Sequence, residues 1–291
     1  EDYCRDRIVN DSDEIYTGQS TIHIDHKESF DNFFDNSDPI SLDDLGIDLH
    51  PNQYVVAKFN NQSLLGVVKN NEIHPLTKDL DSLINVNPRN KEQKFALDLL
   101  TRNDISIVTL TGIAGSGKTF LTLLAALSGV NSKQYDRIIF TRSIEPVGRE
   151  IGFLPGDIDD KMDPWISPIV DNFRHAFKDT SYFEVMRDKG KIEVAPMAFI
   201  RGRTFSKSII IVDEAQNASI HELKTIITRV GDDSKIVLLG DVEQIDTPYL
   251  DTLSNGLTIV IEKFKDQDIA GHVTLMKGER SKLATLASKI I

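Results

Sequence analysis

The chain has 291 residues, 40% of them hydrophobic, which is enough to bury a full α/β core beside a smaller accessory unit. Its single cysteine, Cys4, excludes an intramolecular disulfide and favours a reducing, cytoplasmic location. The longest apolar runs are far too short to cross a bilayer and no signal peptide opens the chain, so we expect no membrane partner. Because the first residue is Glu and not Met, we expect the natural chain to begin further upstream.

The net charge of −12 is unevenly distributed along the chain. Residues 1–50 contain 14 Asp and Glu against three Lys and Arg, a net charge of −11. Residues 51–291 then hold 31 acids and 30 bases, a net charge of −1. The acidic total argues against a nucleic-acid partner, but the nearly neutral main part permits an electropositive groove.

The first 87 residues divide into two parts by composition. Residues 1–50 are rich in Asp, Asn and Ser with few aromatics, so we expect no core of their own and predict an acidic linker or the tail of a missing domain. Residues 51–87 contain two apolar runs, 53–59 and 63–69, between Asn-Asn turns. This pattern predicts a small β-meander or barrel-like module.

Residues 88–291 show the alternation of strands and helices that is typical of a doubly wound, mainly parallel α/β sheet. A helix is expected at residues 90–100, and a strand at 105–111 runs directly into a glycine-rich loop. Further buried strands are expected at residues 137–141, 191–195, 208–212, 235–239 and 272–276, with helical stretches such as 223–230 between them.

The glycine-rich loop at residues 112–119 fits the pattern G-x-x-x-x-G-K-[ST] between a predicted strand and a predicted helix. In such a loop, backbone N–H groups and the helix N-terminus face a phosphate chain. Lys118 should reach the β- and γ-phosphates, and the Thr119 hydroxyl should bind Mg²⁺. We predict a P-loop NTPase with ATP and Mg²⁺ as cofactors, and the expected phosphate-binding residues are Gly112, Ile113, Ala114, Gly115, Ser116, Gly117, Lys118, Thr119 and Phe120.

Two further strands end in polar residues at the same predicted sheet edge, where ligands of open α/β sheets bind. Asp213 and Glu214 follow an apolar run, so Asp213 is expected to hold Mg²⁺ and Glu214 to orient or deprotonate the attacking water. Gln244 follows Gly240 after another apolar run and is expected to sense the γ-phosphate. A plain turn after a core strand is the alternative for Gln244.

These segments resemble a known family. Residues 213–216 together with 240–244 look like the RecA-like ATPase core of superfamily 1 helicases. Residues 88–291 resemble the PhoH family, with matching segments at 139–143, 152–156, 161–165, 168–172 and 199–204. The acidic start and the β-rich module resemble the linker of longer PhoH-like proteins, in which a PIN ribonuclease domain precedes the ATPase.

The resemblance implies a RecA-like motor in a homo-oligomeric ring, a hexamer, that couples ATP hydrolysis to RNA unwinding. Gln93 matches the glutamine that reads adenine, and Arg280 matches the arginine that a neighbouring subunit offers to a phosphate. Arg142, Arg201 and Arg203 match residues beside the nucleic-acid path. The acid cluster of the nuclease is not identifiable in residues 1–50, so we expect no ribonuclease activity from this chain.

Alternatives remain open for each of these assignments. Gln93 also fits an exposed residue at a helix start, and Arg280 an ordinary surface arginine. Arg201 and Arg203 equally fit structural ion pairs, and Trp165 fits core packing better than base stacking.

Three functions follow. The first is an ATP-hydrolysing motor on single-stranded RNA, or DNA, with contacts mainly to the backbone. The second is an NTP-dependent oligomeric switch that moves no strand, and the third is a nucleotide or metabolite kinase, against which Glu214 argues.

Overall fold

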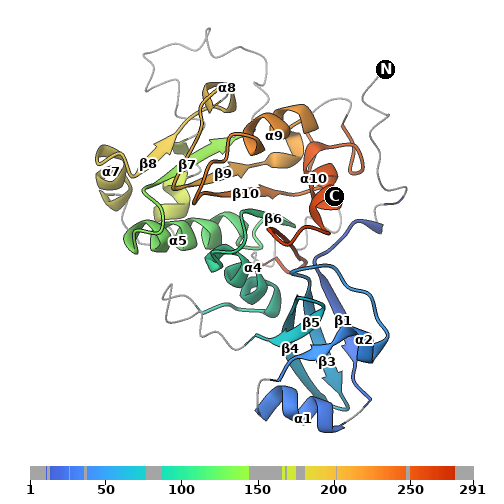
Figure 1. Cartoon of the computed structure of the whole chain (residues 1–291). Coiled ribbons are helices and arrows are strands. Elements are labelled where there is room, and N and C mark those ends of the chain that lie inside the picture. Colours follow the sequence, from blue (N-terminus) through green and yellow to red (C-terminus); the bar gives the residue numbers. More distant parts are fainter. Residues whose placement is uncertain are drawn as a thin grey trace.

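The fold is taken from a computed structural model, which describes residues 11, 14–25, 27–35, 38–76, 87–143, 166–167, 169–174, 181–200, 202–246 and 250–278. Several positions discussed above lie outside these ranges: Cys4, Trp165, Arg201, Arg280 and the segments 152–156 and 161–164. Figure 1 shows a larger α/β unit and, below it, a smaller β-rich unit from the start of the chain.

The larger unit is built on a six-stranded sheet in the order β11-β6-β10-β9-β7-β8, and all neighbouring strands are parallel. Every residue of the two central strands β9 and β10 is buried, as expected for a sheet covered on both faces. This confirms the predicted doubly wound P-loop NTPase fold of the RecA-like type. The strands are β6 (Ile107–Gly112), β7 (Arg137–Arg142), β8 (Ile192–Val194), β9 (Ser208–Asp213), β10 (Lys235–Gly240) and β11 (Ala270–Leu275).

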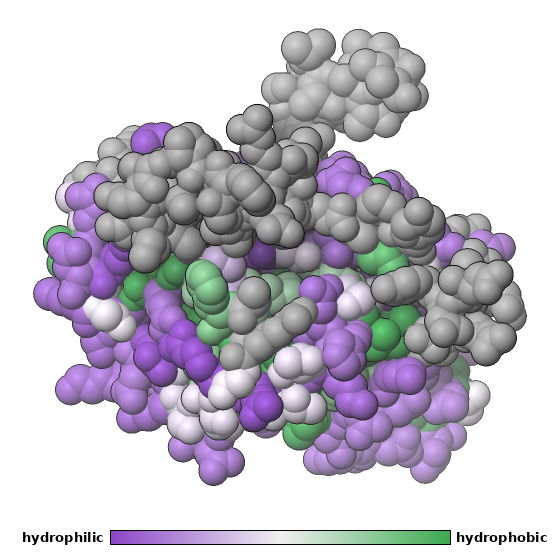
Figure 2. All heavy atoms as spheres, turned by 90° about the horizontal axis from the view of Figure 1, so that it is seen from above, coloured by the Kyte–Doolittle hydropathy of each residue, from purple (hydrophilic) through white to green (hydrophobic). Residues whose placement is uncertain are grey.

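Helices cover both faces of this sheet and bury two separate apolar clusters. Figure 1 shows α4 and α5 on one face and α8, α9 and α10 on the other. Viewed from the α8–α10 side in Figure 2, hydrophilic residues dominate the periphery and apolar residues gather nearer the centre. The helices are α4 (Lys91–Thr101), α5 (Lys118–Asn131), α7 (Ser181–Asp188), α8 (Met197–Ile200), α9 (Ile220–Ile227) and α10 (Gly256–Phe264), with a short 3-10 helix η4 (Ala215–Asn217) after β9.

The predicted elements agree with the structure to within a few residues, and the largest shift is at α9. A helix was expected at residues 223–230, but α9 begins at Ile220. The cause is a capping box: the Ser219 side chain accepts from the Glu222 backbone, and the Glu222 carboxylate accepts from the Ser219 N–H. This local pair starts the helix before its first buried apolar residue, Leu223.

The smaller unit is a five-stranded sheet in the order β1-β3-β4-β5-β2. The antiparallel pairs β3-β4 and β4-β5 form the predicted meander, and Asn60, Asn70 and Asn71 take the positive φ values that its turns require. The elements are β1 (Gln19–His23), α1 (Lys27–Asp35), β2 (Ile40–Ser41), α2 (Leu42–Leu45), β3 (Tyr54–Phe59), β4 (Gln62–Lys69) and β5 (Glu72–Pro75).

The expectation of an acidic linker needs correction at residues 19–45. β1 pairs in parallel with β3, and β2 pairs antiparallel with β5, so this segment supplies both outer strands of the sheet. The apolar residues of this segment are too few for a core of their own. They pack against apolar residues of the meander, and the two sets together form one core. The shared cluster consists of Ile24, Phe30, Phe33, Ile40, Leu42, Val55, Ala57, Val68 and Ile73.

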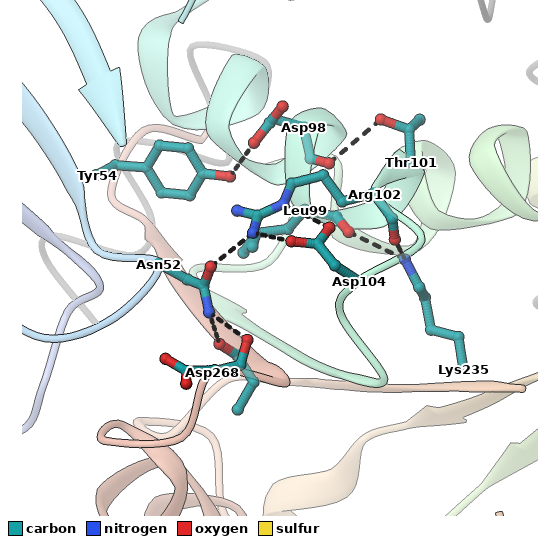
Figure 3. Close-up of polar contacts among 10 residues, drawn as sticks. Asn52, Tyr54, Asp98, Leu99, Thr101, Arg102, Asp104, Lys235 and Asp268 are labelled. Atoms are coloured by element: carbon teal, nitrogen blue, oxygen red, sulfur yellow. Dashed lines mark hydrogen bonds and ion pairs between the residues drawn. The ribbon is translucent and has the colours of Figure 1, made fainter. Parts of the chain in front are cut away.

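A buried polar network joins the two units at α4 (Figure 3). The Asn52 side-chain amide donates to the Asp268 and Ala270 carbonyls, both at 2.8 Å, and its oxygen accepts from Arg102 at 2.7 Å. Beside it, Lys235 Nζ donates to the carbonyls of Leu99, Leu100 and Arg102 at 3.1, 2.9 and 2.7 Å, which caps the C-terminus of α4. The small unit is therefore bonded to the helix whose first turn approaches the glycine-rich loop.

Candidate nucleotide-hydrolysis site

The glycine-rich loop connects β6 to α5 at the carboxyl edge of the sheet. Gly112 has φ 138°, and a Cβ there would meet the Leu275 carbonyl oxygen at 2.2 Å, so no larger residue fits. Gly117 has φ 96° and directly precedes Lys118, the first residue of α5. The loop thus directs the backbone N–H groups of the helix N-terminus toward the position expected for a phosphate.

Lys118, Thr119 and Asp213 meet at the mouth of this loop. Lys118 Nζ donates to the Gly112 carbonyl at 2.5 Å and to the Ile113 carbonyl at 3.2 Å, so its ammonium lies along the loop. Thr119 Oγ1 donates to Oδ1 of Asp213, the last residue of β9, at 3.4 Å. One helix, α5, and one strand, β9, therefore bring a cation, a hydroxyl and a carboxylate to one place.

These groups border a cavity of about 260 Å³ that contains most of the residues singled out from the sequence. Its lining consists of Ala114, Gly115, Gly117, Lys118, Thr119, Phe120, Asn172, Asp213, Glu214, Gly240, Asp241 and Gln244. Gly112, Ile113 and Ser116 belong to the loop but are not among the lining residues. The predicted convergence of the three sequence motifs on one edge is thus present in the structure.

Asp213 is the most electrostatically perturbed carboxylate of the site. Burial raises its pKa, and the nearby charge of Glu214 raises it further, while Arg142 and Lys118 act in the opposite direction, giving a pKa of about 6. A divalent cation would relieve both effects, and the donor set of a carboxylate and a hydroxyl suits Mg²⁺, which is commonly held by one or two protein oxygens plus phosphate oxygens. Asp213 and Thr119 therefore fit a magnesium site.

A buried oxygen without a partner also points toward a ligand. Asp241 Oδ2, on a residue that lines the cavity, is buried and has no hydrogen-bond partner among the described residues. Such orphaned polar atoms are rare in folded proteins and are expected where water, an ion or a ligand completes the site.

Glu214 adopts φ 52°, the left-handed conformation, directly after β9. Arg142 Nη2 donates to its Oε1 at 3.0 Å, and Gln216 Nε2 donates to its Oε2 at 2.7 Å. Gln216 also donates to the Gln244 carbonyl at 2.9 Å and accepts from the Asp241 N–H at 3.2 Å. Through Gln216, the carboxylate of Glu214 is coupled to the turn that follows β10.

Gln93 lies beside the loop and is buried, so it is not the exposed helix-start residue of the alternative interpretation. Its amide nitrogen donates to the Ser116 carbonyl at 3.1 Å, and its amide oxygen accepts from the Arg89 N–H at 2.9 Å. Asn90 caps α4 by accepting from the Gln93 N–H at 2.9 Å. Gln93 is thereby held against the glycine-rich loop, and its reading of adenine stays a prediction.

The comparison with protein families agrees with this geometry. Residues 85–291, which include every motif of the site, match the family model described as PhoH-like protein. The chain belongs to the PhoH-like family. Together with the glycine-rich loop and the acid pair, this assigns it the P-loop NTPase fold.

Members of the PhoH-like family from several bacteria are similar to this chain. Protein PhoH2 of Bacillus subtilis is 42% identical over the whole chain, which covers 67% of that protein. Protein PhoH2 of Thermobispora bispora is 36% identical over 79% of this chain and 52% of its own length. The chain thus spans between about half and two thirds of these PhoH-like relatives.

Among solved structures, a helicase and a large terminase show a weak similarity to the PhoH-like chain. Pif1 helicase from Candida albicans is 15% identical over 70% of this chain and 43% of that chain, with a TM-score of 0.39. The large terminase of bacteriophage D6E is 13% identical over 70% and 50% of the two chains, with a TM-score of 0.41. TM-scores this low support no conclusion about activity.

Two arginines that the PhoH-like resemblance places beside nucleic acid are engaged by carboxylates. Arg142 pairs with Glu214 at 3.0 Å. Arg203 forms a two-pronged pair with Glu193, with Nη2 at 2.9 Å from Oε2, and its guanidinium lies 5.0 Å from the Phe205 ring centroid. Arg203 therefore forms the structural ion pair that was the alternative to a nucleic-acid contact. Contact of either arginine with nucleic acid stays a prediction.

Three residues that line the cavity, or that connect residues lining it, were given no role from the sequence. Gln216 and Asp241 stand inside the two acidic motifs, and Asn172 ends a family-like segment at residues 168–172. Their positions in these motifs were the available signal. Their roles were not predictable because the turn after β9 and the turn after β10 meet only in the folded sheet.

Proposed function

We propose that this chain hydrolyses Mg²⁺-ATP in the cytoplasm and uses the energy to move along single-stranded RNA, or DNA, as the motor part of a PhoH-like protein. The observation that carries the proposal is the cavity in which Lys118, Thr119, Asp213 and Glu214 converge at the carboxyl edge of a parallel sheet. Loop N–H groups, a lysine, a hydroxyl and an acid pair together are the components of phosphoryl transfer to water in P-loop NTPases.

Each residue has a distinct part in this reaction. Lys118 would leave the loop carbonyls for the β- and γ-phosphates, and Thr119 and Asp213 would hold Mg²⁺. When bound there, the cation would supply positive charge against the negative charge that develops on the transferred phosphate. Glu214 orients the attacking water and accepts its proton. Gln244 lines the same cavity and accepts from Gln216 through its carbonyl, so we expect it to transmit loss of the γ-phosphate to the turn after β10.

The translocation part of the proposal rests on the family resemblance. Arg142, Arg203 and Arg201 would contact the phosphates of a strand in the pore of a hexameric ring, and Arg280 of one subunit would reach the nucleotide of the next. The upstream PIN ribonuclease domain of the full-length protein is proposed from the same family resemblance. Contacts to the backbone, with little dependence on base sequence, are expected.

Phosphate release with and without a single-stranded RNA oligomer tests the function. Lys118→Ala should lose nucleotide binding, and Glu214→Gln should bind ATP but hydrolyse it at least about 100-fold more slowly, since it removes the base. Lys189→Ala and Glu184→Gln, at exposed positions in and after α7, are the matched controls and should behave as wild type. A wild type that ignores Mg²⁺-ATP contradicts the proposal.

The same assay separates the two rival functions. An oligomeric switch predicts a rate per subunit that rises with protein concentration and is indifferent to RNA. A kinase predicts a phosphorylated acceptor instead of free phosphate.

A further inference from the structure

Both carboxylate oxygens of Glu214 are occupied by donors of the chain itself. Arg142 holds Oε1 and Gln216 holds Oε2. The backbone of Glu214 is left-handed at φ 52°, a conformation that is unfavourable for a non-glycine residue and persists only where its surroundings impose it. The direction of this side chain is therefore set by its partners and not by its own preference.

Gln216 and Arg142 differ in how firmly the fold holds their side chains. Gln216 is buried, and its amide also bonds the Gln244 carbonyl and the Asp241 N–H, so it is part of the sheet edge. The Arg142 side chain is 25% exposed and pairs with a Glu214 side chain that is 35% exposed. Partly exposed ion pairs contribute only about 0.2–1 kcal/mol, so a competing anion can displace this one.

Arg142 lies at a position where a competing anion has a route to it. It is the last residue of β7, and its register partner on β9 is Asp213, so it stands at the carboxyl edge beside the nucleotide cavity. A guanidinium binds a phosphodiester through two parallel N–H donors, which is at least as good a pairing as the single bond at 3.0 Å to Glu214.

We propose that Arg142 restrains Glu214 from orienting the attacking water, and that a phosphate of a bound single strand releases Glu214 by taking over the Arg142 guanidinium. After release, Glu214 keeps its bond to Gln216 and turns its free oxygen toward the cavity that it already lines. Arg142 is then a positioning residue that makes hydrolysis depend on the strand. This inference rests on the proposed function, in which Glu214 activates water.

The opposite role for the same ion pair is that Arg142 holds Glu214 in its productive direction. The two roles predict changes of opposite sign when the guanidinium is removed. The restraint also predicts that removal of the Arg142 guanidinium changes kcat with little effect on KM. The reason is that neither Arg142 nor its bond to Glu214 involves the phosphate loop.

The test measures steady-state phosphate release by the full chain over a range of ATP concentrations, with and without a uridine oligomer. Without the oligomer, Arg142→Ala should raise kcat about 1.4- to fivefold, the factor that corresponds to 0.2–1 kcal/mol, with unchanged KM. Stimulation by the oligomer should be lost. Arg142→Lys, which keeps the charge but not the forked donors, should keep part of both the restraint and the stimulation.

The matched control is Arg137→Ala. Arg137 is the first residue of the same strand and is ion-paired with Glu193 at 3.7 Å, at the opposite end of the sheet from the nucleotide. It should behave as wild type. If Arg142→Ala fails to fold, Arg142→Gln keeps a polar side chain and carries the same prediction.

The possible outcomes distinguish failure of the Arg142 restraint from failure of the proposed ATP hydrolysis. An unchanged or lower kcat for Arg142→Ala overturns the restraint and leaves ATP hydrolysis standing. A wild type that hydrolyses ATP but ignores the oligomer overturns the release by a strand. A wild type no more active than Lys118→Ala overturns the proposed function, and the restraint with it.

Discussion

Tyr54 of β3 donates a 2.6 Å hydrogen bond to Asp98 of α4, and both side chains are buried at the junction of the two units. The Tyr54 ring also stacks on Phe95 at 4.5 Å between centroids, almost parallel to it. Gln93, in the first turn of α4, bonds the glycine-rich loop, so one helix connects the small sheet to the nucleotide site.

Removal of the Tyr54 hydroxyl should destabilise the protein through this junction. Tyr54→Phe keeps the stacked ring but leaves a buried Asp98 oxygen without its donor, which should lower the free energy of unfolding by about 1–3 kcal/mol. Urea unfolding of Tyr54→Phe, Asp98→Asn and the double variant measures the coupling between the two residues. Additive effects of the two changes would show that the bond contributes nothing.

Lys235 should be important for stability because its side chain is buried and bonded to the backbone. Its ammonium caps three carbonyls at the C-terminus of α4, where a cation also complements the helix dipole. Lys235→Met should lower the free energy of unfolding by about 2–4 kcal/mol, since it leaves these carbonyls without that donor. Lys224→Met, at an exposed position on α9, should change it by less than about 0.5 kcal/mol.

His272 should make the fold sensitive to acid. Burial lowers its pKa to about 3, from 6.5, while a hydrogen bond with the Thr109 backbone acts in the opposite direction. Between these two pKa values the imidazole is protonated in the unfolded chain but neutral in the folded chain. The free energy of unfolding is therefore unaffected by His272 above pH 6.5 and decreases as the pH falls toward 3. Between pH 7 and pH 5 the loss is about 2 kcal/mol.

The difference between wild type and His272→Gln isolates this contribution from other titrating groups. Urea unfolding at several pH values should show a shallower decline for His272→Gln below pH 6.5. His221→Gln, at an exposed position on α9, should follow the wild-type curve. Parallel curves for wild type and His272→Gln would contradict the prediction.

Asp213→Asn should stabilise the protein while it abolishes hydrolysis. The pKa of Asp213 in the folded chain is about 6, above the ordinary 3.8, so ionisation of this residue lowers the free energy of unfolding. This penalty is absent below pH 3.8 and reaches its full size above pH 6. In the presence of a chelator and without nucleotide, Asp213→Asn should raise the free energy of unfolding at pH 7.5 by about 1–3 kcal/mol. The gain should shrink at pH 4.5, and an equal gain at both pH values would exclude this cause.

The phosphate loop and the acid pair were predictable because their chemistry is local. A glycine pattern between a strand and a helix, and two acids at a strand end, have only a few conformations available to them, and the parallel sheet brings strand ends to a common edge. The mutual contacts of these side chains were not predictable. Arg142 meets Glu214 across 72 positions of the chain, and Gln216 meets Gln244 across 28.

The amino-acid sequence by itself determined that this protein has a doubly wound core with a glycine-rich loop between β6 and α5, because periodicity and loop spacing depend on neighbouring residues. Only the tertiary structure decided that residues 19–45 complete the small sheet, that Lys235 caps α4, and that Glu214 is held by Arg142. These depend on pairings between distant segments, for which the chain carries no local signal, since many partners of similar chemistry compete for each side chain until the whole core is packed.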